Sequence, residues 1–323
     1  MSMLKSRETI LALAILALLA AIASRFPGFV SPGNLARVLT DTSPLILLAL
    51  GQMTVILTKC IDLSVAANLA LCGMVAALMN GAGVPLPLIL LAVILLGAAL
   101  GAVNGLLVWK LGIPSIVVTL GTMTIYRGSI FLMTGGAWIN AHQMSDAFKA
   151  FPRTVVLGLP VMAWIGLAGV AAMALVLTRT PLGRAFHAVG GNPHAAVYTG
   201  LSVGRTQCAA FVLSGALAGL TGYLWVARYA VAYVDIAAGF ELDVVAACVI
   251  GGIAIAGGAG SVAGAVMGAL FLGIIKNALP VVGISPFWQM AISGSAILVA
   301  IAFNAASQRE PGRIILKQAE HRT

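Results

Sequence analysis

The sequence predicts an all-α, polytopic membrane protein with about ten transmembrane helices and both termini in the cytoplasm. Hydrophobic residues make up 61% of its 323 residues and charged residues only 8%, against about 25% in an ordinary soluble domain. Charged residues are absent from five long stretches, 63–109, 154–178, 206–227, 244–275 and 277–308. A transmembrane helix needs about 20 apolar residues. The composition therefore excludes a soluble enzyme, a disordered chain and a disulfide-stapled secreted domain.

Ten apolar segments, separated by polar or glycine- and proline-rich breaks, are the predicted spans. They cover about 9–26, 42–58, 64–81, 86–109, 114–134, 155–178, 207–230, 243–257, 261–279 and 286–305. The turn at 81–87, rich in glycine and proline, divides the longest uncharged stretch into two spans. No segment is long and polar enough to form a soluble domain. Residues 1–323 are therefore interpreted as a single transmembrane domain with a cytoplasmic loop at about 179–207.

The distribution of basic residues predicts the orientation. With the N-terminus in the cytoplasm, eleven of the 18 lysines and arginines fall in inside segments, whose net charge is +7 against +1 outside. The positive-inside rule expects this asymmetry of short loops. Topology thus accounts for the net charge of +9, and the basic balance requires no nucleic-acid partner.

Two pairs of segments resemble each other. The sequence of 62–67 is similar to that of 242–247, and both open a predicted span. Glycines at every fourth position from Gly97 are matched by glycines at every fourth position from Gly260. These pairs predict that spans two to five and seven to ten are related halves, as in many transporters, although chance similarity between apolar segments is common. The glycine ladders also predict close helix packing.

Uncharged polar side chains are better represented in the spans than ionisable ones. Amides and hydroxyls exchange hydrogen bonds with a neutral, hydroxylated cargo without burying a charge. Arg127 is the basic residue that lies deepest in a predicted span. The candidate substrate path consists of Gln52, Asn68, Asn104, Thr119, Thr122, Tyr126 and Arg127. Each polar residue taken alone is more often a bond between helices, and the alternative for Arg127 is snorkelling or capping a neighbouring helix.

No catalytic or metal-binding motif is evident. The sequence has no HExxH motif, and the glycine-rich segment 257–261 lacks the lysine of a phosphate-binding loop. Neither the four cysteines nor the four histidines have the spacing of a metal site. We therefore expect no catalytic residue, no cofactor and no metal, and we do not expect this chain to hydrolyse ATP itself.

The cytoplasmic loop contains signals for a short helix. Asn192 is a good N-cap and Pro193 a good first helical residue. Ala195, Ala196 and Tyr198 then form a short helix that Gly200 stops. Such a capped helix on the cytoplasmic face is a candidate contact for another protein.

This loop resembles the coupling loop of ABC importer permeases, whose pattern is Glu-Ala-Ala, three residues, then Gly. Ala195, Ala196 and Gly200 match the pattern, whereas His194 stands where glutamate is usual. The resemblance implies that an ATPase docks here. The candidate coupling residues are Asn192, Pro193, His194, Ala195, Ala196, Val197, Tyr198, Gly200 and Leu201.

Further motifs resemble the ribose-type branch of sugar permeases over nearly the whole chain. Ile61–Val65 matches the IDLSVG segment of that branch, with Ala66 in place of its glycine, and Pro114–Thr122 matches its proline-to-TLGT segment. The glycine block at 250–264 matches as well. Tyr126–Gly128 and Thr134–Ile139 look most like the permeases for rhamnose and for the signal molecule autoinducer-2.

The resemblance implies a bacterial inner-membrane permease subunit of an ABC importer for a sugar or sugar-like molecule. It implies three protein partners: a cytoplasmic ABC ATPase, a second permease subunit that is identical or homologous, and a periplasmic sugar-binding protein. The alternative is an ion-coupled secondary sugar transporter. Carriers of that class use buried acids, and Asp62, at a span boundary, is the only candidate.

The predicted orientation can be tested by cysteine labelling. A membrane-impermeant reagent added outside intact cells should label cysteines introduced at 140–150 and miss those at 185–200. The reverse pattern would contradict the orientation and, with it, the assignment of the coupling loop.

Overall fold

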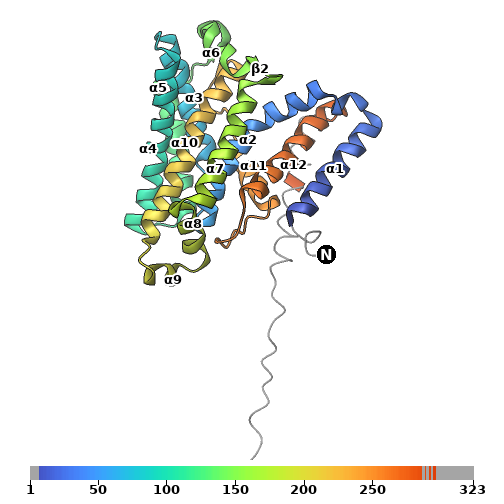
Figure 1. Cartoon of the computed structure of the whole chain (residues 1–323). Coiled ribbons are helices and arrows are strands. Elements are labelled where there is room, and N and C mark those ends of the chain that lie inside the picture. The colour runs from blue at the N-terminus through green and yellow to red at the C-terminus, as the bar shows by residue number, and fades with distance from the viewer. Residues whose placement is uncertain (1–6, 286–287, 289–290, 292–293, 296–323) are drawn as a thin grey trace, which may run out of the picture.

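The computed structural model describes residues 7–285, 288, 291 and 294–295, and it is a bundle of helices (Figure 1). Seven helices in this part of the chain are long and apolar enough to cross a membrane. They are α1 (Arg7–Arg25), α2 (Pro32–Leu57), α4 (Leu86–Leu111), α5 (Ser115–Thr134), α7 (Val161–Arg179), α10 (Val203–Tyr229) and α12 (Val262–Val281). The prediction of a polytopic all-α membrane protein is thus confirmed.

Shorter elements connect and complete these helices. The shorter helices are α3 (Val65–Gly81), α6 (Asp146–Ala150), α8 (Pro181–Gly191), α9 (Pro193–Tyr198) and α11 (Phe240–Ile250), with 3₁₀ turns η2 (Pro27–Val30), η3 (Ala141–Gln143) and η4 (Phe151–Arg153). Two small antiparallel ladders pair β1 (Ile139–Asn140) with β4 (Val231–Ala232) and β2 (Val155–Val156) with β3 (Leu159–Pro160). The first ladder joins segments far apart in the sequence.

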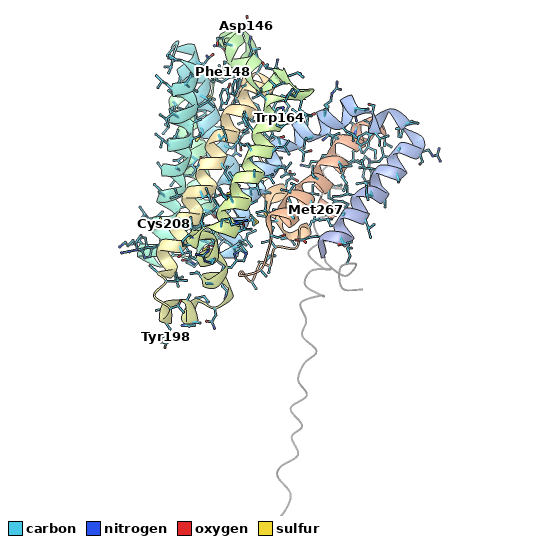
Figure 2. The ribbon with its side chains drawn as sticks, viewed as in Figure 1. Asp146, Phe148, Trp164, Tyr198, Cys208 and Met267 are labelled. Atoms are coloured by element: carbon cyan, nitrogen blue, oxygen red, sulfur yellow. The ribbon has the colours of Figure 1, made fainter. Side chains whose placement is uncertain are left out.

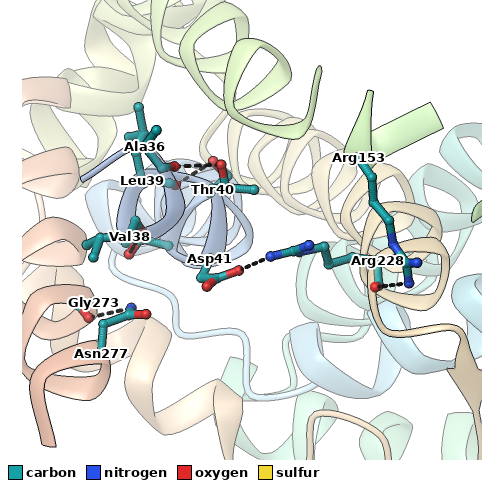
Figure 3. Close-up of polar contacts among 11 residues, drawn as sticks. Ala36, Val38, Leu39, Thr40, Asp41, Arg153, Arg228, Gly273 and Asn277 are labelled. Atoms are coloured by element: carbon teal, nitrogen blue, oxygen red, sulfur yellow. Dashed lines mark hydrogen bonds and ion pairs between the residues drawn. The ribbon is translucent and has the colours of Figure 1, made fainter. Parts of the chain in front are cut away.

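Helix α2 begins ten residues before the predicted span at 42–58. Pro32 occupies its first turn, where the missing N–H costs nothing. The extension includes Asp41, which the charge pattern had placed outside. The Asp41 carboxylate accepts a 2.8 Å ion-paired hydrogen bond from the Arg228 guanidinium of α10, and the Arg228 carbonyl in turn accepts a bond from Arg153 (Figure 3). Because Arg228 neutralises the Asp41 carboxylate, helix α2 can include this charged residue.

The predicted span at 155–178 is wrong in its first residues. Residues 155–160 form the β2–β3 hairpin, and helix α7 begins only at Val161. Leu157 and Gly158 both have positive φ, 50° and 82°, which closes a tight turn. Pro160 also disfavours helical geometry in the residue before it.

The predicted span at 243–257 is also wrong in its extent. Helix α11 has 11 residues, about 16 Å at 1.5 Å per residue, whereas the hydrocarbon core is about 30 Å thick. The helix ends at Ile250 with Gly251 as its C-cap, and Gly252 has a φ of 82°. A non-helical segment then leads to α12, so α11 alone is too short to cross the hydrocarbon core. The tenth predicted span, 286–305, lies largely outside the described residues.

The centre of the bundle is α10, which packs most extensively against α4 and α3. Glycines make the α4–α10 contact a contact between backbones. A Cβ at Gly215 would overlap the carbonyl oxygen of Gly97, and one at Gly101 would overlap that of Phe211. The ladder that starts at Gly97 therefore serves close packing, as predicted.

In each predicted half, the later helices pack against the first helix of the other half. Helices α3 and α4 of the first half pack against α10 of the second, and α11 and α12 of the second pack against α2 of the first. Reciprocal packing of this kind is what two related halves would produce. The second glycine ladder is used differently, because Gly264 and Gly268 approach α11 rather than α2.

The α4–α10 contact yields a stability prediction. Replacing Gly215 with leucine should prevent folding, because the added side chain meets the α4 backbone rather than a side chain that can move. A Cβ at Gly121 on α5 meets no atom within 4 Å, so Gly121→Ala should leave stability unchanged or raise it by about 0.4–1 kcal/mol. Size-exclusion profiles and thermal unfolding in one detergent provide the measurement. A monodisperse Gly215→Leu protein with a wild-type midpoint would refute the prediction.

Candidate functional site

A polar network lies where the connection between α2 and α3 meets α4. Oδ1 of Asp62 accepts hydrogen bonds from the Ser64 backbone N–H at 2.9 Å and from the Ser64 hydroxyl at 2.6 Å. The Asn104 amide of α4 donates to the same hydroxyl oxygen at 2.8 Å. The side-chain amide of Gln52, oriented to donate and accept, faces both the C=O and the N–H of Asp62 at 3.2 Å. The four residues are buried.

The Asp62 carboxyl has no basic partner among the described residues. Burial raises its pKa to about 6, and the two hydrogen bonds from Ser64 oppose that rise. The Asn104 amide oxygen is also unsatisfied: it is buried and lacks a hydrogen-bond partner in the described part of the chain. An unmet buried acceptor costs about 1–3 kcal/mol, so this region is well packed but not fully satisfied.

The other predicted path residues also bond within the chain. Asn68 donates to the Gly97 carbonyl at 3.1 Å, and Tyr126 donates to the Leu100 carbonyl at 2.9 Å, so both side chains reach α4. Thr119 reaches the Ile61 carbonyl at 3.4 Å. Thr122, also buried, bonds back to the Thr119 carbonyl. The structure thus gathers six of the seven predicted path residues between α2, α3, α4 and α5, each buried.

Arg127 is the exception, because it is only half-buried and points away from this network. Its guanidinium donates to the carbonyl of Val234 at 2.7 Å and reaches that of Ile236 at 3.4 Å. Both carbonyls belong to the connection between α10 and α11. Arg127 therefore fastens α5 to a segment more than 100 residues later in the chain. This role is close to the alternative of capping a neighbouring helix, except that the carbonyls belong to a loop.

The opposite face of α5 is exposed and carries small or polar residues between apolar ones. Gly121 and Gly128 have open space around them, and Thr124 lies between them with its hydroxyl bonded only to its own helix. Leu120 and Ile125 on this face are exposed as well. Thr124 lies within the predicted span 114–134, but the sequence gives no signal of which helix face it occupies.

At one end of the bundle, α8 packs on two turns that come from opposite halves of the chain. The Gly258 N–H donates to the Leu57 carbonyl at 3.0 Å. A Cβ at Gly190 would overlap the same Leu57 carbonyl, and the His187 ring bonds the Gly260 carbonyl at 3.3 Å. The end of α2, the end of α8 and the turn before α12 therefore form one junction. The sequence treated 179–207 as a loop and missed α8, although Thr180 caps it and Pro181 starts it.

Helix α9 directly follows α8 at this junction, and most of its residues are exposed. The Asn192 side chain accepts from the Ala195 N–H at 3.0 Å, Pro193 is the first helical residue, and the helix ends at Tyr198. Gly200 has a φ of 83°, and the Leu201 N–H closes the end on the Ala196 carbonyl. The predicted short helix is therefore confirmed, with its N-cap and its left-handed glycine.

The tip of α9 presents apolar side chains to solvent. Tyr198 is 92% exposed and Val197 58% exposed, whereas Ala196 is buried against the rest of the chain. Tyr198 lies at the far end of the molecule from Asp146 (Figure 2). Of the six remaining coupling candidates, Asn192, His194, Ala195 and Gly200 are exposed, whereas Pro193 and Leu201 are half-buried.

Sequence comparison assigns the family. The sequence matches the family described as "Branched-chain amino acid transport system / permease component" over residues 34–301. The chain belongs to this permease family. The permease is 38% identical over 297 residues to the autoinducer 2 import system permease protein LsrC of Enterobacter sp. (strain 638), covering 92% of this chain and 86% of that protein.

A second group of relatives imports ribose. The permease is 38% identical over 299 residues to the ribose import permease protein RbsC of Escherichia coli (strain K12), covering 92% of this chain and 93% of that protein. No solved structure matches the sequence. The permease is thus of the sugar ABC importer type, an inner-membrane transport component rather than an enzyme.

The buried network predicts which polar residues hold the fold. Asn104→Ala should lower the free energy of unfolding by about 1–3 kcal/mol, because Ser64 loses a buried donor. Thr124→Ala is the control: its hydroxyl is exposed on α5, and the change should stay within about 0.5 kcal/mol. Thermal unfolding of both purified variants in one detergent is the measurement. Equal midpoints for the two variants would show that the network does not stabilise the fold.

Proposed function

We propose that the chain forms the translocation path of an ATP-driven importer for a neutral hydroxylated monosaccharide or sugar-like molecule. It would do so with a second permease subunit, a cytoplasmic ABC ATPase and a periplasmic sugar-binding protein. The observation that carries this proposal is the capped, exposed helix α9, whose tip is apolar yet lies at the end of the molecule, outside the long helices. Exposed apolar residues in such a place are typical of a protein contact.

Helix α9 is suited to transmit a movement because of what holds it. It follows α8 directly, and α8 contacts the Leu57 carbonyl and the turn at 257–260. A displacement of Tyr198 by a closing ATPase would therefore reach α2 and α12 together, one helix from each half of the chain. His194 replaces the usual glutamate, so the contact would rely on Val197, Tyr198 and Leu201 rather than on a carboxylate.

We place the cargo path along α5. Its inner face holds Thr119, Thr122 and Tyr126, and Asn104 nearby has an unpaired oxygen that a cargo hydroxyl could satisfy if the helices separate. Its outer face, with Gly121 and Thr124, is open in a single chain. A second permease subunit facing α5 would enclose this surface and complete a path with hydroxyls on it.

The names of the relatives support two chemical types of cargo. Their names describe import of autoinducer-2 and of ribose. Both fit a path lined by hydroxyls and amides without buried charge. A rhamnose-like cargo is supported only by the resemblance of the segments at 126–128 and 134–139.

The alternative of an ion-coupled sugar transporter rests on one residue. Asp62 is the buried acid of the described chain, and a buried carboxyl can carry a proton across a membrane. However, Ser64 holds its Oδ1 with two bonds, as expected of a residue that shapes the α2–α3 connection. The two classes differ in their requirement for ATP.

The coupling proposal predicts the effect of Gly200→Val. A β-branched residue is strained at a φ of 83°, so the end of α9 should unwind and the ATPase contact should be lost. In proteoliposomes that contain the permease, its ATPase and its binding protein, sugar uptake and cargo-stimulated ATP hydrolysis should both fall at least tenfold. The tenfold figure corresponds to about 1.4 kcal/mol.

Gly191→Val is the matched control, because Gly191 is also exposed near α9 but its φ is not positive and no atom lies near its Cβ. It should retain uptake. Wild-type activity in Gly200→Val would show that α9 is not the coupling element. Uptake by the permease without ATP or an ATPase would instead support the ion-coupled alternative.

A further inference from the structure

An aromatic pair is exposed at the end of the bundle opposite α9. The ring of Trp138 stacks on that of Tyr233, with centroids 4.5 Å apart and planes inclined by 17°. Trp138 is 57% exposed, so Tyr233 covers one face of its ring and leaves the other free. The stack fixes the orientation of a large, flat and partly apolar surface.

Two independent contacts hold this pair at the end of α5. Trp138 directly precedes β1, which pairs with β4, so that Ile139 lies opposite Ala232. Arg127 of α5 fastens the segment that follows Tyr233 through the carbonyls of Val234 and Ile236. The pair is therefore attached to the helix on which the cargo path is placed.

The polar atoms of both rings are unused. Neither the indole N–H of Trp138 nor the hydroxyl of Tyr233 has a hydrogen-bond partner among the described residues. By contrast, the indole N–H of Trp164 donates to the Val156 carbonyl at 2.9 Å. A free ring face with a donor and a hydroxyl at its edge suits a sugar, whose C–H face packs on the ring while its hydroxyls take the polar atoms.

The surroundings of the pair are polar rather than lipid-like. The residues that follow Trp138 include Asn140, His142 and Gln143, and all three side chains belong to exposed residues. Asp235, two residues after Tyr233, is also exposed and forms no ion pair in the described part of the chain. Lipid tails would leave these polar groups unsatisfied, so we expect the free ring face to contact water rather than lipid.

We propose that Trp138 and Tyr233 form a sugar-binding subsite at the outer end of α5, where cargo arrives before it enters the path. This inference rests on the proposed function, because it takes this end of the bundle as the side of delivery. The subsite extends the proposed function, because Trp138 and Tyr233 would favour a cargo with a flat, hydroxylated ring.

The test compares Trp138→Ala and Trp138→Phe with Trp164→Phe as the matched control. The assembled importer in proteoliposomes receives D-ribose and, separately, autoinducer-2, and uptake is divided by ATP hydrolysed. We expect the ratio to fall about tenfold for Trp138→Ala and about threefold for Trp138→Phe, as for loss of a central aromatic contact. Basal ATP hydrolysis and complex assembly should stay at wild-type level, which a merely structural role would not predict. Trp164→Phe should match wild type.

The other outcomes distinguish a failure of the Trp138–Tyr233 subsite from a failure of the importer proposal. If the wild type imports either compound and Trp138→Ala keeps the wild-type ratio, the subsite is wrong and the importer stands. If the wild type shows no ATP-driven uptake of either compound, the two cargo types drawn from the relatives are wrong, and the subsite proposed for them fails with them.

A second measurement tests what covers the ring. In a variant that keeps Trp138 as its single tryptophan, reconstituted in nanodiscs, millimolar D-ribose should change the emission and brominated lipid should not quench it. Quenching by the lipid would assign the ring to the bilayer. Disulfide formation between two copies of Trp138→Cys would assign it to a subunit contact, and either result would overturn the subsite.

Discussion

The direct contact between the backbones of α4 and α10 is the constraint on which the rest of the structure depends. Without side chains at Gly97, Gly101 and Gly215, α10 can lie at the centre of the bundle and contact α3 and α4 along its length. In lipid, where burial of apolar surface gives little driving force, such close approach supplies much of the attraction between helices. The polar network around Asp62 and the long reach of Arg127 both require the elements that this contact positions.

The sequence was informative where a local rule decides the structure. Asn192, Pro193 and Gly200 define a helix by capping and by backbone preference alone, and the structure has that helix. The glycine ladder beginning at Gly97 likewise indicated close packing. Boundaries were less predictable, because hydropathy does not distinguish the β2–β3 hairpin or the short α11 from the ends of full spans.

What the sequence could not show is which distant groups meet. Asp41 precedes the predicted span, but in the structure it lies within α2, where it pairs with Arg228, 187 residues away. The partners of Arg127 are backbone carbonyls, which leave no trace in residue identity. The candidate path residues were selected for polarity, and polarity does not say whether a hydroxyl such as Thr119 faces a cargo or a neighbouring helix.

The exchange of first helices between the two halves has a consequence for biosynthesis. Helix α2 ends at Leu57 and its partner α12 begins at Val262, so at about 5–20 residues per second the ribosome needs roughly 10–40 seconds to make the second after the first. For most of that interval Asp41 lacks Arg228, and until its end α2 lacks its contact with α12. The packing of α2 against α11 and α12 is therefore completed late, only after the C-terminal half of the chain has been made.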